Sequence, residues 1–242
     1  MNSTFKPEKI NRLMLKISGE ILAGPAGFGF DDKVCDQLTD ELIGIKNEGY
    51  GIAVVLGGGN IFRGGSQKNL SLNRVTLDNI GMLATIQNAL YLCEILLAKA
   101  CAAEVFSSFV LDKIARHYSA PKVQESLAKG KICFLAGGTG NPYFTTDTAA
   151  VLRAIELKLD IMMKATKVDG LYSADPMKDA NAAFIREANY QTCLERRLGV
   201  MDLTAFSLAA DNNMPIKIFN IAKAGNLKAA LQDVDIGTYI HP

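Results

Sequence analysis

The stretch 131–150, KICFLAGGTGNPYFTTDTAA, decides the fold. It begins with an apolar run, Ile132 to Ala136, which has the length of a buried strand in a parallel sheet. Glycines and a proline interrupt residues 137–142, and the following Thr-Thr-Asp, residues 145–147, offers helix N-caps. A strand, a glycine-rich turn and a helix N-terminus form a concave set of backbone N–H donors. We interpret the stretch as a phosphate and nucleoside site; the alternative is a tight turn without a ligand.

Another glycine turn follows a predicted strand earlier in the chain. Residues 52–56 are apolar, and Gly57-Gly58-Gly59-Asn60 comes directly after them, with Arg63 close behind. Arginine is suited to bidentate contacts with phosphate, although a flexible surface loop is the alternative. Lys16 lies near the end of a first strand, residues 12–17, where open α/β sheets bind ligands. A strand-end lysine with its charged head in water is the alternative there.

Composition excludes several classes of protein. The 242 residues are 49% hydrophobic and 21% charged, as in an ordinary soluble globular protein. A net charge of +1 gives no general attraction to nucleic acid or membrane, so anion binding must be local. The N-terminus lacks the apolar segment of a signal peptide, and no run approaches the roughly 18 residues of a membrane span. We therefore expect a cytoplasmic protein.

Cysteine and histidine carry no predicted chemistry. Because no CxxC spacing occurs, we expect buried free thiols in a reducing compartment rather than a metal site or disulfide framework. His117 and His241 have no carboxylate or second histidine nearby in the sequence, so neither is assigned a role. The cysteines are Cys35, Cys93, Cys101, Cys133 and Cys193.

Strands and helices alternate along the chain. This order predicts one α/β domain, residues 1–242, with a doubly wound, mostly parallel open sheet sandwiched by helices. Strands are predicted at 12–17, 52–56, 104–110, 132–136, 161–163 and 215–220, with a final extended run at 237–240. Helices are predicted after Asp31-Asp32, at 71–103, 122–129, 190–198, 202–212 and 226–231, and after the glycine-rich turn at 137–142.

Two segments carry further candidates. On the helix at 71–103, Arg74 and Asp78 lie four residues apart, so a solvated ion pair competes with any function for Asp78. Gly81 and Ala84 indicate close packing against another element or a subunit. Residues 171–176 are predicted to be an irregular loop in which a tyrosine and a carboxylate suit a base and a ribose, the alternative being a capped loop.

The motifs favour phosphoryl transfer. There is no G-x-x-x-x-G-K-[ST] P-loop, no protein kinase motif set and no Ser/His/Asp arrangement with a nucleophile elbow. Two glycine turns, one lysine and one arginine are instead predicted at strand ends. Positioning and charge neutralisation do most of the catalysis in phosphoryl transfer, which suits this set of groups.

Six segments carry a family resemblance. They are KISGE (16–20), GGGNIFRG (57–64), NRVTLDNIGMLAT (73–85), GGTGNPYFTTDTAA (137–150), KATKVDGLYSADP (164–176) and VMDLTAF (200–206). Together they resemble the bacterial uridylate kinases of the amino-acid kinase superfamily, and the similarity extends over the chain from about residue 10. The resemblance implies an amino-acid kinase-like fold and transfer of the ATP γ-phosphate to UMP in pyrimidine nucleotide biosynthesis.

The resemblance also implies the site residues. Lys16, Arg63 and Asp147 would be catalytic. ATP would bind at Lys16, Ser18, Gly19, Gly59, Arg63, Thr166, Tyr172 and Asp175. UMP would bind at Gly58, Asp78, Thr139, Gly140, Asn141, Pro142, Tyr143, Phe144, Thr145 and Thr146. A loop for allosteric activation by GTP would contain Gly27, Phe28, Gly29 and Asp31.

Further expectations follow from the same likeness. The N-terminal half would serve mainly UMP and oligomer contacts, and the C-terminal half mainly ATP. Mg²⁺ would enter with ATP, held through phosphates and water without protein ligands, while Asp147 orients Lys16 or the magnesium hydration shell. GTP and UTP would be effectors of a homohexamer with the helix at 71–103 in a subunit contact.

Two other function classes are weighed against this one. A different amino-acid kinase would phosphorylate a small carboxylate such as aspartate or acetylglutamate, and the segment TGNPYFTTD together with Asp78 argues against it. A non-catalytic nucleotide-binding or storage protein is the second class. The presence of Lys16, Arg63 and Asp147 argues against that class.

Overall fold

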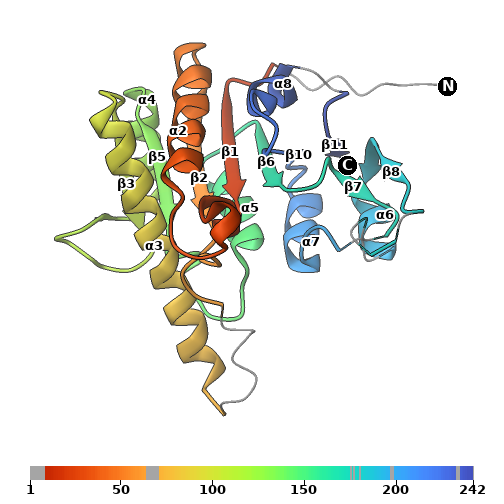
Figure 1. Ribbon diagram of the computed structural model, residues 1–242, viewed down its shortest axis with the longest axis horizontal. Helices are drawn as coiled ribbons and strands as arrows, with labels where there is room; N and C mark the ends of the chain where they lie inside the picture. Colours follow the sequence, from red (N-terminus) through yellow and green to blue (C-terminus); the bar gives the residue numbers. More distant parts are fainter. Residues whose placement is uncertain are drawn as a thin grey trace.

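A nine-stranded, mostly parallel sheet forms the centre of the computed structural model, which describes residues 9–63, 71–174, 176, 178–179, 181–196, 199–232 and 235–241. The strand order is β4-β3-β5-β2-β1-β6-β10-β11-β9, and the β10–β11 pair is antiparallel (Figure 1). The strands are β1 Arg12–Ile17, β2 Gly51–Leu56, β3 Ala103–Ser107, β4 Arg116–His117, β5 Ile132–Ala136, β6 Ile161–Thr166, β9 Glu187–Asn189, β10 Ile216–Asn220 and β11 Thr238–His241. A separate antiparallel pair joins β7 Leu171–Tyr172 to β8 Phe184–Ile185.

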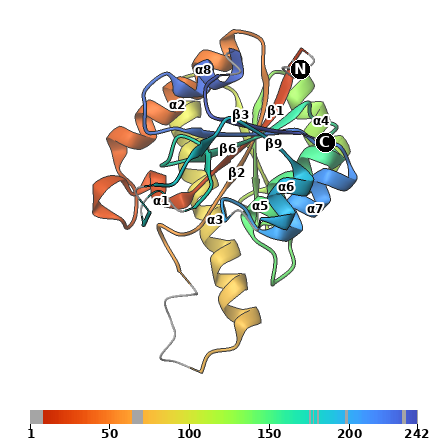
Figure 2. The same cartoon turned by 90° about the vertical axis from the view of Figure 1, so that its right-hand side faces the viewer.

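Helices cover both faces of the sheet. Figure 2 shows α2, α3 and α8 on one face and α4, α5, α6 and α7 on the other. The helices are α1 Gly19–Leu22, α2 Asp32–Asn47, α3 Arg74–Ala98, α4 Ala120–Ala128, α5 Thr146–Glu156, α6 Tyr190–Glu195, α7 Leu203–Asp211 and α8 Asn226–Gln232. Each face buries its own apolar cluster, so the predicted doubly wound α/β architecture is confirmed.

The alternation of side chains along β1 decides what faces each layer. Leu13, Leu15 and Ile17 join the cluster beneath α2 and α3, whereas Met14 joins the cluster beneath α5. Because side chains two residues apart lie on the same face of a strand, Lys16 follows Met14 toward α5. A buried lysine is thereby placed under the N-terminal turn of that helix.

Several element boundaries differ from prediction by a few residues, and helix α3 and strands β3 and β6 are examples. Helix α3 ends at Ala98 instead of residue 103, because Ala100 is left-handed with φ 56° and the chain then enters β3. Strand β3 ends at Ser107 instead of residue 110. Strand β6 continues to Thr166 instead of ending at Met163, which places Lys164 inside a buried strand.

Short strands escaped prediction. Residues 171–172 are paired with 184–185, so the expected irregular loop begins as a small hairpin. Strands β4, β8 and β9 span only two or three residues each and have no run long enough to show a period. The pairing of β11 with β9 also brings His241 Nε2 to 2.8 Å from Glu187 Oε1. The expectation that His241 has no carboxylate nearby is therefore wrong.

The cysteines and the long helix complete the core. All five cysteines are free and buried, as predicted, and burial raises the pKa of Cys133 to about 12.

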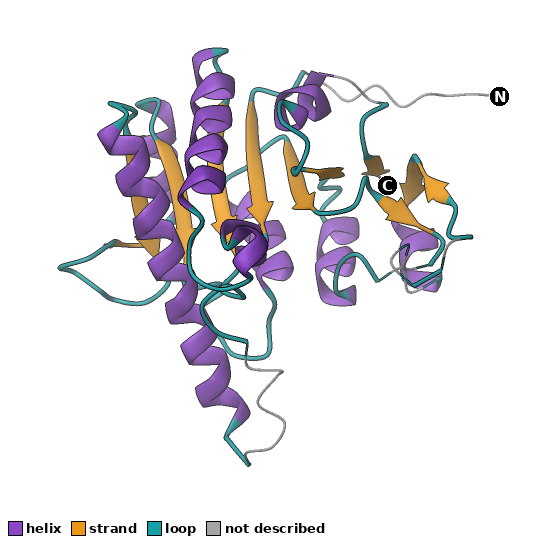
Figure 3. Ribbon diagram, viewed as in Figure 1, coloured by secondary structure: helices purple, strands orange, loops and turns teal. Residues whose placement is uncertain are grey.

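Helix α3 is long and apolar enough, by length and composition, to cross a membrane, contrary to the expectation of no such run. Half of that apolar window is buried inside the protein, and core helices pass the same test. The α3 helix extends past the sheet on the side where β1 and β2 end (Figure 3).

Candidate active site

Three charged side chains meet beneath the N-terminus of α5. Lys16 and Lys164 are paired residues of the adjacent parallel strands β1 and β6, so their side chains lie next to each other. Asp147, in the first turn of α5, lies against both: Lys16 Nζ is 2.7 Å from Asp147 Oδ1, and Lys164 Nζ is 2.5 Å from Oδ2. All three residues are buried. We call Lys16, Lys164 and Asp147 the charged cluster.

The charged cluster contains two positively charged side chains and one negatively charged side chain. Burial alone would raise the pKa of Asp147, but the two lysine ammonium groups outweigh it and hold that pKa below its ordinary value. Burial, aided by repulsion from Lys16, lowers the pKa of Lys164 against the attraction of Asp147. Buried charges require compensation. An incoming anion such as a phosphoryl group would supply the missing negative charge.

The first glycine turn lies between β1, α1 and α3. Gly57 N donates to Ile17 O at 2.8 Å, which ties the turn to the end of β1. A Cβ on Gly19 would lie 2.5 Å from Gly57 O, and one on Gly58 would lie 2.7 Å from Gly81 O and 2.9 Å from Ala84 Cβ. The turn thus packs closely against Gly81 and Ala84 of α3, as predicted, although a Cβ on Gly81 itself would meet nothing within 4 Å.

Arg63 lies at the outer edge of this turn. Its Nε donates to Gly59 O at 3.0 Å, and its Nη2 contacts Glu20 Oε1 at 2.9 Å. The guanidinium is half exposed. To contact phosphate, as the sequence analysis predicted, the guanidinium must exchange its contact with Glu20 for one with phosphate oxygens. Glu20 belongs to the KISGE segment but was not a predicted site residue.

The second glycine turn leads to the nucleoside segment. Gly137, Gly138 and Gly140 have φ of 79°, 57° and 81°, a left-handed conformation that glycine adopts without strain. Gly137 N donates to Thr85 Oγ1 of α3 at 2.9 Å. Helix α3 therefore contacts both glycine turns. The next residues, Thr139 to Phe144, form the loop that the resemblance assigns to UMP.

Asp78 forms the ion pair that was one of its two alternatives, and it also contacts the predicted UMP loop. It accepts hydrogen bonds from Arg74 Nε at 2.8 and 2.9 Å, which is the predicted i,i+4 pair. It also accepts from Tyr143 N at 2.8 Å, across 65 residues of sequence. Tyr143 itself is left-handed, with φ 72°. The carboxylate thus holds the predicted UMP loop in place from α3.

Thr145 caps α5, as the sequence predicted. Its Oγ1 accepts from Asp147 N at 3.1 Å and from Thr148 N at 3.2 Å. The same hydroxyl donates to Asp202, which also accepts from Thr148 Oγ1 at 2.9 Å and caps α7. Asp202 therefore fixes the helix terminus that carries Asp147.

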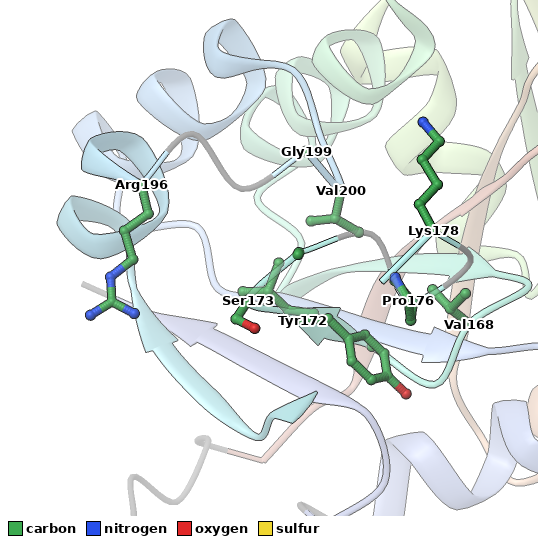
Figure 4. A pocket seen from close by; sticks show the side chains of 11 residues that line it. Val168, Tyr172, Ser173, Pro176, Lys178, Arg196, Gly199 and Val200 are labelled. Carbon is green, nitrogen blue, oxygen red and sulfur yellow. The ribbon is translucent and has the colours of Figure 1, made fainter. Parts of the chain in front are cut away.

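A cavity of about 560 Å³ opens beside the charged cluster. Figure 4 shows Tyr172 and Ser173 of the hairpin segment and Val200 among the residues that surround it. Lys164 Nζ donates to Val200 O, so this cavity adjoins the cluster. Its lining is Val168, Gly170, Leu171, Tyr172, Ser173, Ala174, Pro176, Lys178, Arg196, Gly199 and Val200.

Of two residues predicted to bind ATP, the structure describes Thr166 and leaves Asp175 outside the described residues. Thr166 lies at the end of β6, where its Oγ1 donates to Val168 O at 2.6 Å and fixes the strand end at the cavity. Tyr172 also borders a second cavity of about 360 Å³, together with Asp169, Phe184, Lys223, Asn226, Asp235, Ile236 and Gly237.

The segment 27–31 contacts the first glycine turn. Gly27 and Gly29 are left-handed, and Phe28 is exposed. Asp31 caps α2 by accepting from Val34 N at 3.0 Å. Gly29 N donates to Asn60 O at 2.9 Å, and Asn60 Nδ2 donates to Gly29 O at 2.9 Å. The predicted effector loop is therefore bonded to the turn predicted to hold phosphate.

Comparison with known proteins decides the family. The model of the amino acid kinase family matches residues 11–220. A uridylate kinase from Photorhabdus laumondii is 44% identical over 229 residues, covering 95% of this chain and 95% of its own length. One from Yersinia enterocolitica is also 44% identical and covers 95% and 92%. The chain belongs to the uridylate kinases of the amino acid kinase family.

Solved structures of the family share the fold. A UMP kinase from Bacillus anthracis has a TM-score of 0.93 at 34% identity, covering 98% of this chain and 97% of that one. A UMP kinase from Ureaplasma parvum has a TM-score of 0.91 at 33% identity, covering 97% and 100%. The family resemblance of the sequence motifs is confirmed.

The uridylate kinase motifs are brought together at one edge of the sheet. Lys16 and Asp147 are in contact, and Tyr172 lines the cavity. Ser18 lies beside Gly57, and Gly19 lies beside Gly57 and Gly59. Lys164 and Asp202 were missed. Both lie within quoted segments, but the strand was expected to end before Lys164, and Asp202 was predicted only as the first residue of a helix. No local pattern marked Lys164, because its place beside Lys16 depends on the register of β1 and β6.

Proposed function

We propose that this uridylate kinase transfers the γ-phosphate of ATP to UMP, giving UDP in the cytoplasmic synthesis of pyrimidine nucleotides. The charged cluster is the observation that carries the proposal. It lies between the loop at 139–146, on the acceptor side, and the cavity beside Tyr172, on the donor side. The division of the chain into acceptor and donor halves is only approximate in this proposal. The loop at 139–146 of the C-terminal half would serve UMP, and ATP would contact five residues of the N-terminal half: Lys16, Ser18, Gly19, Gly59 and Arg63.

In this proposal catalysis comes mainly from positive charge that stabilises the transferring phosphoryl group. The attacking oxygen of UMP is already ionised at pH 7, so no general base is needed. Lys16 neutralises charge on the transferring phosphoryl group, Lys164 holds Asp147 from the other side, and Asp147 fixes both ammonium groups. The N–H groups of Gly58, Gly59 and the first turn of α5 hold the non-bridging oxygens.

Mg²⁺ would enter with ATP. Among the described residues no group of three or more His, Cys, Asp or Glu side chains is placed to hold a metal ion. Asp147 Oδ1 is buried and pairs with Lys16 without accepting a well-aligned hydrogen bond. That oxygen fits a contact to the hydration shell of a phosphate-bound Mg²⁺, which neutralises charge on the donor phosphates.

Substrate choice tests the function. We expect ADP release with UMP to exceed that with CMP in kcat/KM, because cytosine reverses the hydrogen-bond polarity at positions that Thr139 and Asn141 face in this proposal. Each unpaired buried group costs about 1–3 kcal/mol. A coupled ADP-release assay compares UMP, CMP, dTMP, aspartate and acetylglutamate. Comparable kcat/KM values for CMP and UMP would contradict the proposed contacts to the base. Turnover of aspartate or acetylglutamate would favour a different amino-acid kinase. No turnover of any substrate would favour a nucleotide-binding protein.

Arg63 is expected to serve both binding and transfer. Arg63→Ala should raise the KM for UMP and lower kcat, because an arginine also grips the ground-state phosphate. Glu20→Gln is the matched change on the other side of the ion pair, since it removes the charge of the carboxylate that the guanidinium now contacts. Steady-state kinetics with UMP varied at saturating ATP give both constants. An unchanged KM in Arg63→Ala would place the arginine away from UMP.

A hexamer with α3 at a subunit contact is expected from the family. The described part of α3 exposes Val75, Ile80, Leu83 and Leu97, and the neighbouring segment exposes Val110 and Ile114. Exposed apolar groups spread along one long helix fit burial against another subunit. Light scattering at micromolar concentration measures the mass. A monomer would contradict the prediction and would leave GTP and UTP, the proposed effectors, without a subunit interface to act through.

A further inference from the structure

Two buried asparagines join three segments around the first glycine turn. Asn60, the last residue of GGGN, and Asn88, on α3, are both 0% exposed. Their amides face each other: Asn60 Nδ2 donates to Asn88 Oδ1 at 3.0 Å, and Asn88 Nδ2 donates to Asn60 Oδ1 at 2.7 Å. We call Asn60 and Asn88 the amide pair.

Each amide also reaches a backbone carbonyl. Asn88 Nδ2 donates to Gly57 O at 2.7 Å, at the start of the turn, and Asn60 Nδ2 donates to Gly29 O at 2.9 Å. Both N–H groups of each amide are therefore used, with no solvent to take over. A fully satisfied buried polar network is rigid and adopts one arrangement. The amide pair thus fixes Gly57 relative to α3 and Gly29.

Nothing in the phosphate chemistry requires these two side chains, since neither is charged or exposed. Their bonds instead determine where the backbone of residues 57–59 lies. The same helix, α3, sets the second turn through Thr85 and the acceptor loop through Asp78. One helix therefore positions the groups of both glycine turns, and Asn88 is its contact with the first.

We propose that Asn60 and Asn88 are positioning residues for phosphoryl transfer, and that the loop at 27–31 acts on the glycine turn through Asn60. The proposal rests on the proposed kinase function. The N–H groups of Gly58 and Gly59 stabilise charge best in one orientation, and the amide pair holds the turn in it. A displacement of the turn leaves the sites for uracil and adenine in place and weakens only the contacts to the transferring group.

The test is a double-mutant cycle with Asn60→Ala, Asn88→Ala and both together. We expect either single variant to lower kcat by roughly 10-fold to 100-fold, as for a misplaced catalytic group, with KM for UMP and ATP changed by less than about threefold. Because the amides act as one unit, the double variant should be no slower than the slower single variant. Independent roles would multiply the two losses.

Ser126→Ala is the control for general destabilisation. Ser126 is a buried residue of α4, and its hydroxyl donates to Glu104 at 2.6 Å, away from both glycine turns. We expect kcat within about twofold of wild type for this variant, with stability measured by denaturant for every protein. If Asn88→Ala does not fold, Asn60→Ser decides by the same kinetic criterion.

The outcomes distinguish failure of the proposed kinase function from failure of the positioning role of the amide pair. Wild-type protein without UMP-dependent ADP release overturns the kinase function and this proposal with it. Active wild type with kcat of both single variants within twofold overturns the positioning role alone. The positioning role is also overturned if the kcat losses of the two single variants multiply in the double variant. It is overturned as well if Ser126→Ala lowers kcat as much as the single asparagine variants do.

Discussion

Replacing Lys16 by methionine is expected to lower kcat by roughly 10²-fold to 10³-fold, as when a preorganised electrostatic contact is removed, while nucleotide binding weakens only modestly. Methionine keeps much of the length of the side chain and removes the charge. Lys16 lies at the end of β1, 2.7 Å from Asp147, where it faces charge that shifts during transfer. Measurement of kcat and KM for both substrates gives the result.

The Lys16→Met variant should also fold normally. It leaves Asp147 paired with Lys164 at 2.5 Å, so the buried cluster becomes neutral instead of carrying an extra cation. Lys131→Met is the matched control, because Lys131 is partly exposed and pairs with Glu104 at 3.2 Å away from the site. Near wild-type turnover in Lys16→Met would place the reacting phosphate elsewhere.

Replacing Asp147 by asparagine is expected to have the largest effect on stability. It leaves two buried ammonium groups without the carboxylate that pairs with both of them, and removal of one partner of a buried pair typically costs about 3–5 kcal/mol. The free energy of unfolding, measured by denaturant, should fall accordingly, and kcat should fall with it. This loss contrasts with the tolerance expected of Lys16→Met, although both changes remove one charge from the same cluster.

A second substitution separates charge from packing. In Asp147→Asn/Lys164→Met only Lys16 remains charged, so the double variant should regain part of the stability lost in Asp147→Asn. No recovery would mean that the loss comes from the first turn of α5 and not from uncompensated charge.

The pH dependence follows from the lowered pKa of Asp147. Burial raises that pKa, the two lysines lower it more, and the folded value lies below the ordinary 3.8. The stabilising contribution is therefore complete above the unfolded value and is lost as the pH falls through the folded pKa. Between pH 6 and 9 the carboxylate stays ionised. The Asp147→Asn variant should thus show a lower kcat without any shift of an acid limb.

Much of the fold and part of the site could be predicted because their signals are local. The apolar runs ending in glycine at 132–140 and 52–59 predict strands followed by anion-holding turns, and Thr145 is a recognisable cap. Lys16 could be placed at a strand end from its distance to the following glycine. These features depend on neighbours within a few residues.

The remaining features depend on contacts between distant segments. Lys164 joins the site because β6 is in register with β1 and extends past Met163, which no local pattern indicated. Asp202 reaches Thr145 across 57 residues, and Asn88 reaches Gly57 across 31. Two-residue strands such as β4 form because a neighbouring edge offers bonds. Such pairings are decided by tertiary packing and not by propensity.

The excess positive charge of the cluster has a consequence for the protein before any substrate arrives. The free protein must hold two ammonium groups and one carboxylate in a region that water hardly reaches, so the charged cluster is electrostatically frustrated when no anion is bound. A bound nucleotide relieves that frustration and, by mass action, adds to the stability of the folded state. Cellular nucleotides would then stabilise the folded enzyme as well as serve as its substrates. Their depletion would make the enzyme more prone to unfolding and proteolysis, in addition to stopping turnover.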